Sequence, residues 1–167
     1  MTDIIQQFAA KARAMGKRNL FNAGATDAKI AAFAERFGFE LPPLVAGFYR
    51  HFDGGCFADD TWCDEELADP DQRATILWNS HAFLSLDEII HCTVFDSVEV
   101  FEDEGRWFIP LLRTPGHEVL VLEQGHAEVL DAFHEYLPED WLPLYPDFAS
   151  LLQAYIDNEG EIETIAG

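Results

Sequence analysis

The side chains best suited to chemistry include a histidine and an aspartate two residues apart, His51 and Asp53. An imidazole and a carboxylate this close suit acid–base catalysis or metal binding. Residues at positions i and i+2 do not share a helix face, so joint action requires Asp53 to lie beyond the end of the helix. We favour a structural or surface role for both, the commoner situation for a half-buried histidine.

Cysteine chemistry is a second possibility and depends on Cys56, which directly follows two glycines. A reactive thiolate needs a nearby base or a positive environment. Cys56 instead has Asp53, Asp59 and Asp60 as neighbours in sequence, whose charges disfavour the thiolate, so we expect an inert thiol. No Cys-x-x-Cys pair is present, which argues against a disulfide framework and a zinc ribbon. The three cysteines are Cys56, Cys63 and Cys92.

Two further histidines, His117 and His126, fall in predicted turns on either side of one predicted strand. They could approach each other in a hairpin, but no third ligand accompanies them, and we interpret them as exposed polar residues. The sequence contains no His-Glu-x-x-His, phosphate-loop or Gly-x-Ser-x-Gly motif. It therefore predicts no catalytic site, no metal site and no cofactor.

An acidic segment at residues 59–71 contains Pro70 and no basic residue. Its acidic residues are Asp59, Asp60, Asp64, Glu65, Glu66, Asp69 and Asp71. Their spacing does not match the twelve-residue calcium loop, so only adventitious divalent binding is expected. Nothing here builds a core, which predicts a solvated loop or a hairpin extension. Trp62, in the middle, could anchor an interface or pin its own loop to the domain.

Charge is distributed unevenly along this chain of net charge −21. Residues 1–50 hold seven Lys or Arg and four Asp or Glu, whereas residues 51–167 hold three Arg and 27 acids. Such a surface repels phosphates, which excludes nucleic acid and anionic membranes as partners. It suits a basic protein partner, because complementary fields speed association. Improved solubility is the alternative explanation for the acidity.

The positions of the acidic and histidine side chains depend on the secondary structure of the chain. The first third of the sequence predicts helices. Apolar residues at helical spacing predict a helix over 3–15 and a second one capped by Thr26. Gly38 ends that helix, and Pro42 pushes Leu41 toward extended geometry. Pro43 then opens a third helix, which ends at Asp53-Gly54-Gly55.

The next part of the chain is predicted to form consecutive strands with one short helix among them. Ser85 and Glu88 form a capping box that predicts a helix over about 85–91. Pro110 indicates an edge strand or a bulge, and the order of Pro115 and Gly116 indicates a type II turn. The predicted strands are 74–78, 98–104, 106–112, 119–122 and 128–131. The continuously apolar strand 119–122 is expected to be covered on both faces of the sheet. Consecutive hairpins make the sheet antiparallel.

The end of the chain is expected to cover this sheet. Residues 138–146 are rich in Trp, Tyr and Pro and are predicted to be irregular. Asp147 begins a last helix, which Gly160 ends. The sequence thus predicts one α+β domain over 1–167, with N-terminal helices, a central antiparallel sheet and a C-terminal covering helix. No secretion signal or long apolar run is present, which predicts a cytoplasmic protein.

The helix, Leu-Pro-Pro elbow, helix and Gly-Gly exit resemble the signature of the SUKH superfamily. That group includes the fungal Smi/Knr-type cell-wall regulators, the bacterial protein Syd and many bacterial immunity proteins. The matching segments are 37–42 and 53–55, where Asp53 replaces the usual asparagine, followed by 83–89, 108–110 and 148–156. The resemblance covers about 27–157 and leaves 158–167 as an acidic tail. Its structural motif residues are Gly38, Leu41, Pro42, Gly54 and Gly55.

The resemblance implies a non-enzymatic protein-binding domain, and above all an immunity protein that neutralises a toxin domain, often a nuclease. Nuclease active sites must attract phosphate, so an acidic surface can compete for the same field. The expected contact patch is Asp59, Asp60, Trp62, Asp64, Glu65 and Glu66, extended by Glu102, Asp103 and Glu104 if the sheet brings them near. A cytosolic regulatory or scaffold module is the alternative. The chain can be a monomer or a homodimer.

Overall fold

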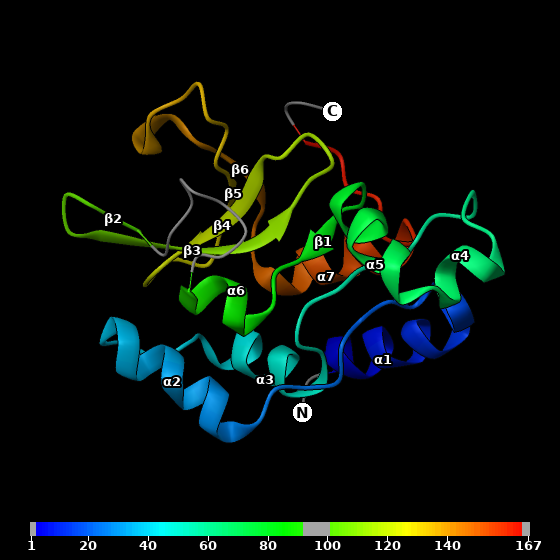
Figure 1. Cartoon of the computed structure of the whole chain (residues 1–167). Coiled ribbons are helices and arrows are strands. Elements are labelled where there is room, and N and C mark those ends of the chain that lie inside the picture. Colours follow the sequence, from blue (N-terminus) through cyan, green and yellow to red (C-terminus); the bar gives the residue numbers. More distant parts are fainter. Residues whose placement is uncertain (1–2, 92–100, 165–167) are drawn as a thin grey trace.

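Helices occupy the first half of the chain and strands most of the second half (Figure 1). The computed structural model describes residues 3–91 and 101–164. Its α-helices are α1 (Asp3–Met15), α2 (Asp27–Phe37), α3 (Pro43–His51), α4 (Asp64–Ala68), α5 (Pro70–Trp78), α6 (Leu86–His91) and α7 (Phe148–Asp157). Two short 3-10 helices are η1 (Gly16–Arg18) and η2 (Pro138–Asp140). The strands are β1 (Ala82–Phe83), β2 (Phe101–Asp103), β3 (Arg106–Arg113), β4 (Val119–Glu123), β5 (Val129–Asp131) and β6 (Leu142–Tyr145).

The sheet is antiparallel throughout the described residues, in the order β1-β3-β4-β5-β6. β3 is the longest strand and pairs with two short partners on its other side. β1 pairs with its last residues, through Phe83 and Leu112, and β2 pairs with its first, through Asp103 and Arg106. The register shifts between Pro110 and Leu112, so the predicted irregularity at Pro110 is a bulge. The predicted α+β domain is confirmed.

The main core lies between the sheet and the helices α1, α3 and α7, which Figure 1 shows together on one side of the sheet. Aromatic rings fill its centre: Phe8 lies edge-on to Phe48, with ring centroids 5.1 Å apart, and stacks on Tyr155 at 5.9 Å. The opposite face of the sheet carries a smaller cluster built on Phe108 and Val121. β4 is therefore buried on both faces, as its continuously apolar sequence predicts.

The helix boundaries follow the capping residues that the sequence provides. The Thr26 hydroxyl accepts the Lys29 backbone N–H at 3.2 Å and begins α2. The Ser85 hydroxyl accepts the Glu88 N–H at 3.1 Å, and the Glu88 carboxylate accepts the Ser85 N–H at 3.4 Å. This reciprocal capping box begins α6, as predicted. The Asp147 carboxylate accepts the Ser150 N–H at 2.7 Å and so caps α7.

Two predictions for residues 59–78 are wrong. Residues 64–68 form α4 within a segment predicted to be a loop or hairpin, and the predicted strand 74–78 belongs to α5. Pro70 fits the first turn of α5, and the Asp69 side chain accepts the Asp71 N–H at 2.9 Å. Only Ile76 of α5 is fully buried, so the apolar residues here do not show a wide helical stripe.

Two further predictions for the second half also need correction. Residues 142–145, predicted to be irregular, form β6, which pairs with β5 through Asp131 and Leu142. The turn at 114–117 is closed by a His117 N–H to Thr114 carbonyl bond of 2.9 Å, but it is not type II. Gly116 does not take the positive φ that type II requires, and His117 has φ 65° instead. Of the predicted strand 98–104, residues 98–100 lie outside the described part of the chain and 101–103 form β2.

Candidate protein-interaction surfaces

The residues of the structural motif lie where α2 ends, where α3 begins and just after α3. Gly38 ends α2 with φ 82°, in the left-handed region that glycine adopts without strain. Leu41 is buried, and Pro42 precedes α3 with φ −52° and ψ 145°. Gly55 has φ 125° and donates its N–H to the Phe83 carbonyl at 3.0 Å. A side chain at Gly55 would lie 2.4 Å from the backbone oxygen of Leu20, so only glycine fits.

His51 and Asp53 do not form a joint site. The His51 ring is exposed, and its Nδ1 lies 2.9 Å from the Gly47 carbonyl oxygen. The Asp53 carboxylate is buried and is used internally: Oδ1 accepts the Leu86 N–H at 2.8 Å and Oδ2 accepts the Lys29 ammonium at 3.3 Å. This arrangement agrees with the structural role that we favour for Asp53.

Cys56 is fully buried, and burial raises the pKa of its thiol to about 11. The expected inert thiol is therefore supported, but for a different reason. Loss of solvation is the main cause of the higher pKa, and the charge of Asp59 contributes least. A thiol that is neutral at physiological pH and shielded from solvent is a poor nucleophile.

The histidines around β4 lie at its two ends and do not meet. His117 stacks on Trp78, with ring centroids 4.3 Å apart. His126 Nε2 lies 3.6 Å from a carboxylate oxygen of Glu123. No group of three His, Cys, Asp or Glu side chains suited to a metal ion occurs within residues 3–91 and 101–164.

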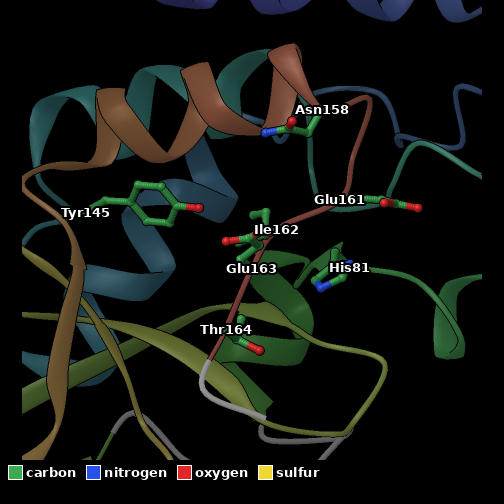
Figure 2. A pocket seen from close by; sticks show the side chains of 7 residues that line it. All are labelled: His81, Tyr145, Asn158, Glu161, Ile162, Glu163 and Thr164. Atoms are coloured by element: carbon green, nitrogen blue, oxygen red, sulfur yellow. The ribbon is translucent and has the colours of Figure 1, made fainter. Parts of the chain in front are cut away.

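A pocket of about 620 Å³ lies beside the end of α7, and Figure 2 shows the side chains that line it. Burial lowers the pKa of His81, so its imidazole is neutral at pH 7. Burial, and then the charge of Glu163, raises the pKa of Tyr145. The described lining side chains make no hydrogen bonds to one another, so they form no assembled pair of nucleophile and base. The remaining lining residues are Asn158, Glu161, Ile162 and Thr164.

The acidic helix surface, which we define as Asp59, Asp60, Trp62, Asp64, Glu65 and Glu66, surrounds α4. Several of its carboxylates already have partners. Asp64 lies 3.1 Å from the Lys17 ammonium, and Glu66 accepts the Cys63 N–H at 3.2 Å. Asp60 and Glu65 are exposed and form no ion pair with any described residue. Trp62 is half-buried against the small cluster that includes Cys56, so it pins its own loop to the domain.

Glu102, Asp103 and Glu104 do not extend the acidic helix surface. They lie on β2 and its turn, and Figure 1 shows β2 and α4 at opposite ends of the molecule. Their neighbourhood is instead the start of β3, because the charges of Asp103 and Glu139 both act on Arg106 and raise its pKa further. The main cause of that higher pKa is the Glu123 carboxylate, which accepts two hydrogen bonds from Arg106, at 2.7 and 2.9 Å.

The structure adds a group of exposed apolar residues that sequence reasoning did not single out. Tyr136, Leu137 and Leu142 flank η2 and begin β6, with exposed fractions of 43%, 62% and 50%. Their signal in the sequence is a concentration of Trp, Tyr, Leu and Pro without helical or alternating spacing. Glu139 and Asp140 lie between them and are exposed.

Comparison with known proteins agrees with this arrangement. Residues 24–163 match the SMI1 / KNR4 family (SUKH-1). A search of curated proteins gives no match. No helix within the described residues has the length and apolar character needed to cross a membrane. The family match spans α2 to α7 and the strands β1 to β6, and the chain therefore belongs to the SMI1 / KNR4 family (SUKH-1).

Proposed function

We propose that this chain is a non-enzymatic protein-binding domain that neutralises a bacterial toxin, through an acidic surface that faces a basic surface of the toxin. Membership of the SUKH family supports a protein-interaction role. A nuclease is the toxin class whose own chemistry best fits, because its active site must attract phosphate. The acidic helix surface and the carboxylates around β2 are the contact regions that we propose.

The observation that carries the proposal is the lack of compensating positive charge in the second half of the chain. After Arg73 the sequence contains only two Lys or Arg residues, Arg106 and Arg113. Arg106 is held by Glu123, and the buried Arg113 donates to the Leu77 carbonyl oxygen. Neither cation forms an ion pair with an exposed carboxylate of the described residues. The resulting negative field attracts a basic protein and repels nucleic acid and anionic membranes.

A neutralisation assay tests the proposed function directly. Each candidate toxin domain encoded beside this gene is expressed in a host with and without this chain, and growth is followed. We expect the chain to restore growth and to bind the purified toxin domain. Affinity should fall steeply between about 50 mM and about 500 mM NaCl, because salt screens the steering field. Equal affinity at both salt concentrations would contradict an electrostatic mode of binding.

The family also supports a second function, that of a cytosolic regulatory or scaffold module with a non-toxin partner. The two functions differ in their genetic context and in the phenotype of a deletion. A neighbouring toxin gene whose product kills only the deletion strain supports neutralisation. A growth or envelope defect of the deletion strain without any such gene supports regulation. Light scattering of the purified chain distinguishes a monomer from a homodimer in either case.

A further inference from the structure

The segment around η2 exposes apolar side chains although it is firmly attached to the sheet. Of the four large hydrophobic residues exposed in the described part of the chain, three lie here: Tyr136, Leu137 and Leu142. Trp141 anchors the segment, because its ring packs edge-on against Phe108 at 5.1 Å and its Nε1 donates to the Tyr136 carbonyl at 3.2 Å. The anchored backbone therefore holds its apolar neighbours out in solvent, which is typical of an interaction site.

A small cavity lies beside these residues. Its volume is about 220 Å³, below the range of about 300–1,000 Å³ that is usual for small-molecule pockets. Trp141, Pro138 and Pro143 form part of its lining, together with the carboxylates of Glu128 and Glu139. An aromatic ring, two proline rings and two carboxylates suit a single Lys or Arg side chain, whose stem packs on apolar surface while its charge meets the acids.

The charge around the cavity also favours a cationic guest. Arg106 is the only Lys or Arg side chain that lines it, and both oxygens of Glu123 already bind that guanidinium. Glu128 and Glu139 are exposed, and Asp103 lies near Arg106 on β2. An incoming lysine or arginine can therefore form charge-assisted hydrogen bonds with Glu128 and Glu139, which form no ion pair with Arg106.

We propose that this region is a docking surface for a protein segment in which Lys or Arg side chains flank apolar ones. We define the η2–β6 surface as the apolar residues Tyr136, Leu137, Trp141 and Leu142 with the acidic residues Asp103, Glu128 and Glu139. The proposal rests on the proposed function, since it locates the surface that receives a basic partner. A second copy of this chain does not fit, because a symmetric contact would place the same carboxylates against each other.

Two peptides of equal charge test the surface. One alternates lysine with leucine over seven residues, and the other replaces every leucine by glycine. We expect the lysine–leucine peptide to shift the amide resonances of residues 136–142 and to bind about tenfold more tightly than the lysine–glycine peptide, because only its leucines can bury apolar surface against the exposed apolar side chains. Equal affinity of the two peptides, or shifts centred on residues 59–71, would overturn the proposal.

Matched variants separate this surface from the acidic helix surface. The double variant L137S/L142S should weaken binding of the lysine–leucine peptide about tenfold. The triple variant D103N/E128Q/E139Q should weaken it similarly and flatten its salt dependence. The control D60N/E65Q/D71N removes the same number of charges at the α4 end and should change affinity by less than about twofold. All eight residues are outside the buried core, and thermal melting verifies that each variant folds.

The same variants distinguish this proposal from the proposed function. If the chain protects cells from the toxin and L137S/L142S protects equally well, the η2–β6 surface is not the docking surface, although neutralisation stands. If the peptide binds at residues 136–142 and the chain does not protect cells, the surface stands and neutralisation fails. Loss of protection in L137S/L142S supports both, and protection by the α4 variant then shows separately whether the acidic helix surface also contacts the toxin.

Discussion

Asp53 and Leu86 are joined by a hydrogen bond between the carboxylate Oδ1 of the first and the backbone N–H of the second, at 2.8 Å. The bond connects the exit from α3 with the first residue of α6, which are 33 positions apart in sequence. The other carboxylate oxygen accepts the Lys29 ammonium from α2. One buried side chain therefore ties three helices together, which explains how an aspartate serves in a position where the related motif has asparagine.

Replacement of Asp53 should destabilise the fold in proportion to the bonds that are lost. Asp53→Ala leaves the Leu86 N–H without its partner, and we expect a loss of about 2–3 kcal/mol in the free energy of unfolding. Asp53→Asn keeps an acceptor for Leu86 and loses only the charge, at a cost of about 1 kcal/mol. Urea denaturation measures both values. Asp87→Ala, which removes the exposed partner of Lys29, is the control and should cost less than about 1 kcal/mol.

Substitutions at Gly55 and Gly105 distinguish two costs of a side chain at a positive φ, the backbone strain and the steric clash. Both have positive φ, 125° and 84°, but a Cβ at Gly55 would lie 2.4 Å from the Leu20 oxygen, whereas a Cβ at Gly105 meets nothing within 4 Å. Gly105→Ala should therefore cost only the conformational strain, about 1–2 kcal/mol. Gly55→Ala adds a backbone clash and should cost more than about 3 kcal/mol. Equal losses in denaturant unfolding would show that the clash relaxes.

Two buried tyrosines differ in the hydrogen bonds that their hydroxyl groups form. The Tyr155 hydroxyl donates to the His81 carbonyl at 2.7 Å and accepts the Phe57 N–H at 3.1 Å. The Tyr49 hydroxyl donates to the Leu84 carbonyl at 2.7 Å. An orphaned buried N–H is the rarer defect in proteins, so Tyr155→Phe should cost about 2 kcal/mol and Tyr49→Phe about 1 kcal/mol. Thermal or urea unfolding of the two variants gives the comparison, and a larger loss for Tyr49→Phe would contradict it.

The elements that sequence predicts correctly are those whose signals are local. Thr26 and Ser85 cap α2 and α6 through their own side chains, and an apolar stripe follows each cap. The sequence predicts a strand in place of the end of α5 because the apolar run 74–78 has no clear period. Its true start depends on the cap by Asp69 and on Pro70, which lie outside that run.

The positions of the acidic segments relative to each other depend on tertiary pairing. β1 pairs with the end of β3 near Arg113, and β2 pairs with the end near Arg106. This pairing places the acidic residues of the segment 59–71 far from those on β2. No local pattern encodes this choice. The exposure of Leu137 and Leu142 is similarly hidden, because leucine usually indicates burial and only the anchoring of Trp141 shows which face they take.

The pairing of Glu123 with Arg106 should make stability depend on pH in the acid range. Hydrogen bonds from Arg106 lower the pKa of Glu123 below its ordinary value of 4.5, while partial burial opposes the change. The folded state therefore binds this proton less readily than the unfolded chain. The stabilisation is complete above the unfolded pKa and is lost as the pH falls through the lower, folded pKa.

A comparison of the protein with Glu123→Gln isolates that contribution from the many other carboxylates, since those are common to both proteins. At pH 7 we expect Glu123→Gln to lower the free energy of unfolding by about 1 kcal/mol, a small value because the Arg106 side chain is 38% exposed. The difference should shrink as the pH falls below 4.5. A double-mutant cycle with Arg106→Gln assigns it to the pair: the coupling energy should vanish at low pH together with the difference. A difference that stays constant from neutral to acid pH would show that Glu123 contributes through packing and not through its charge.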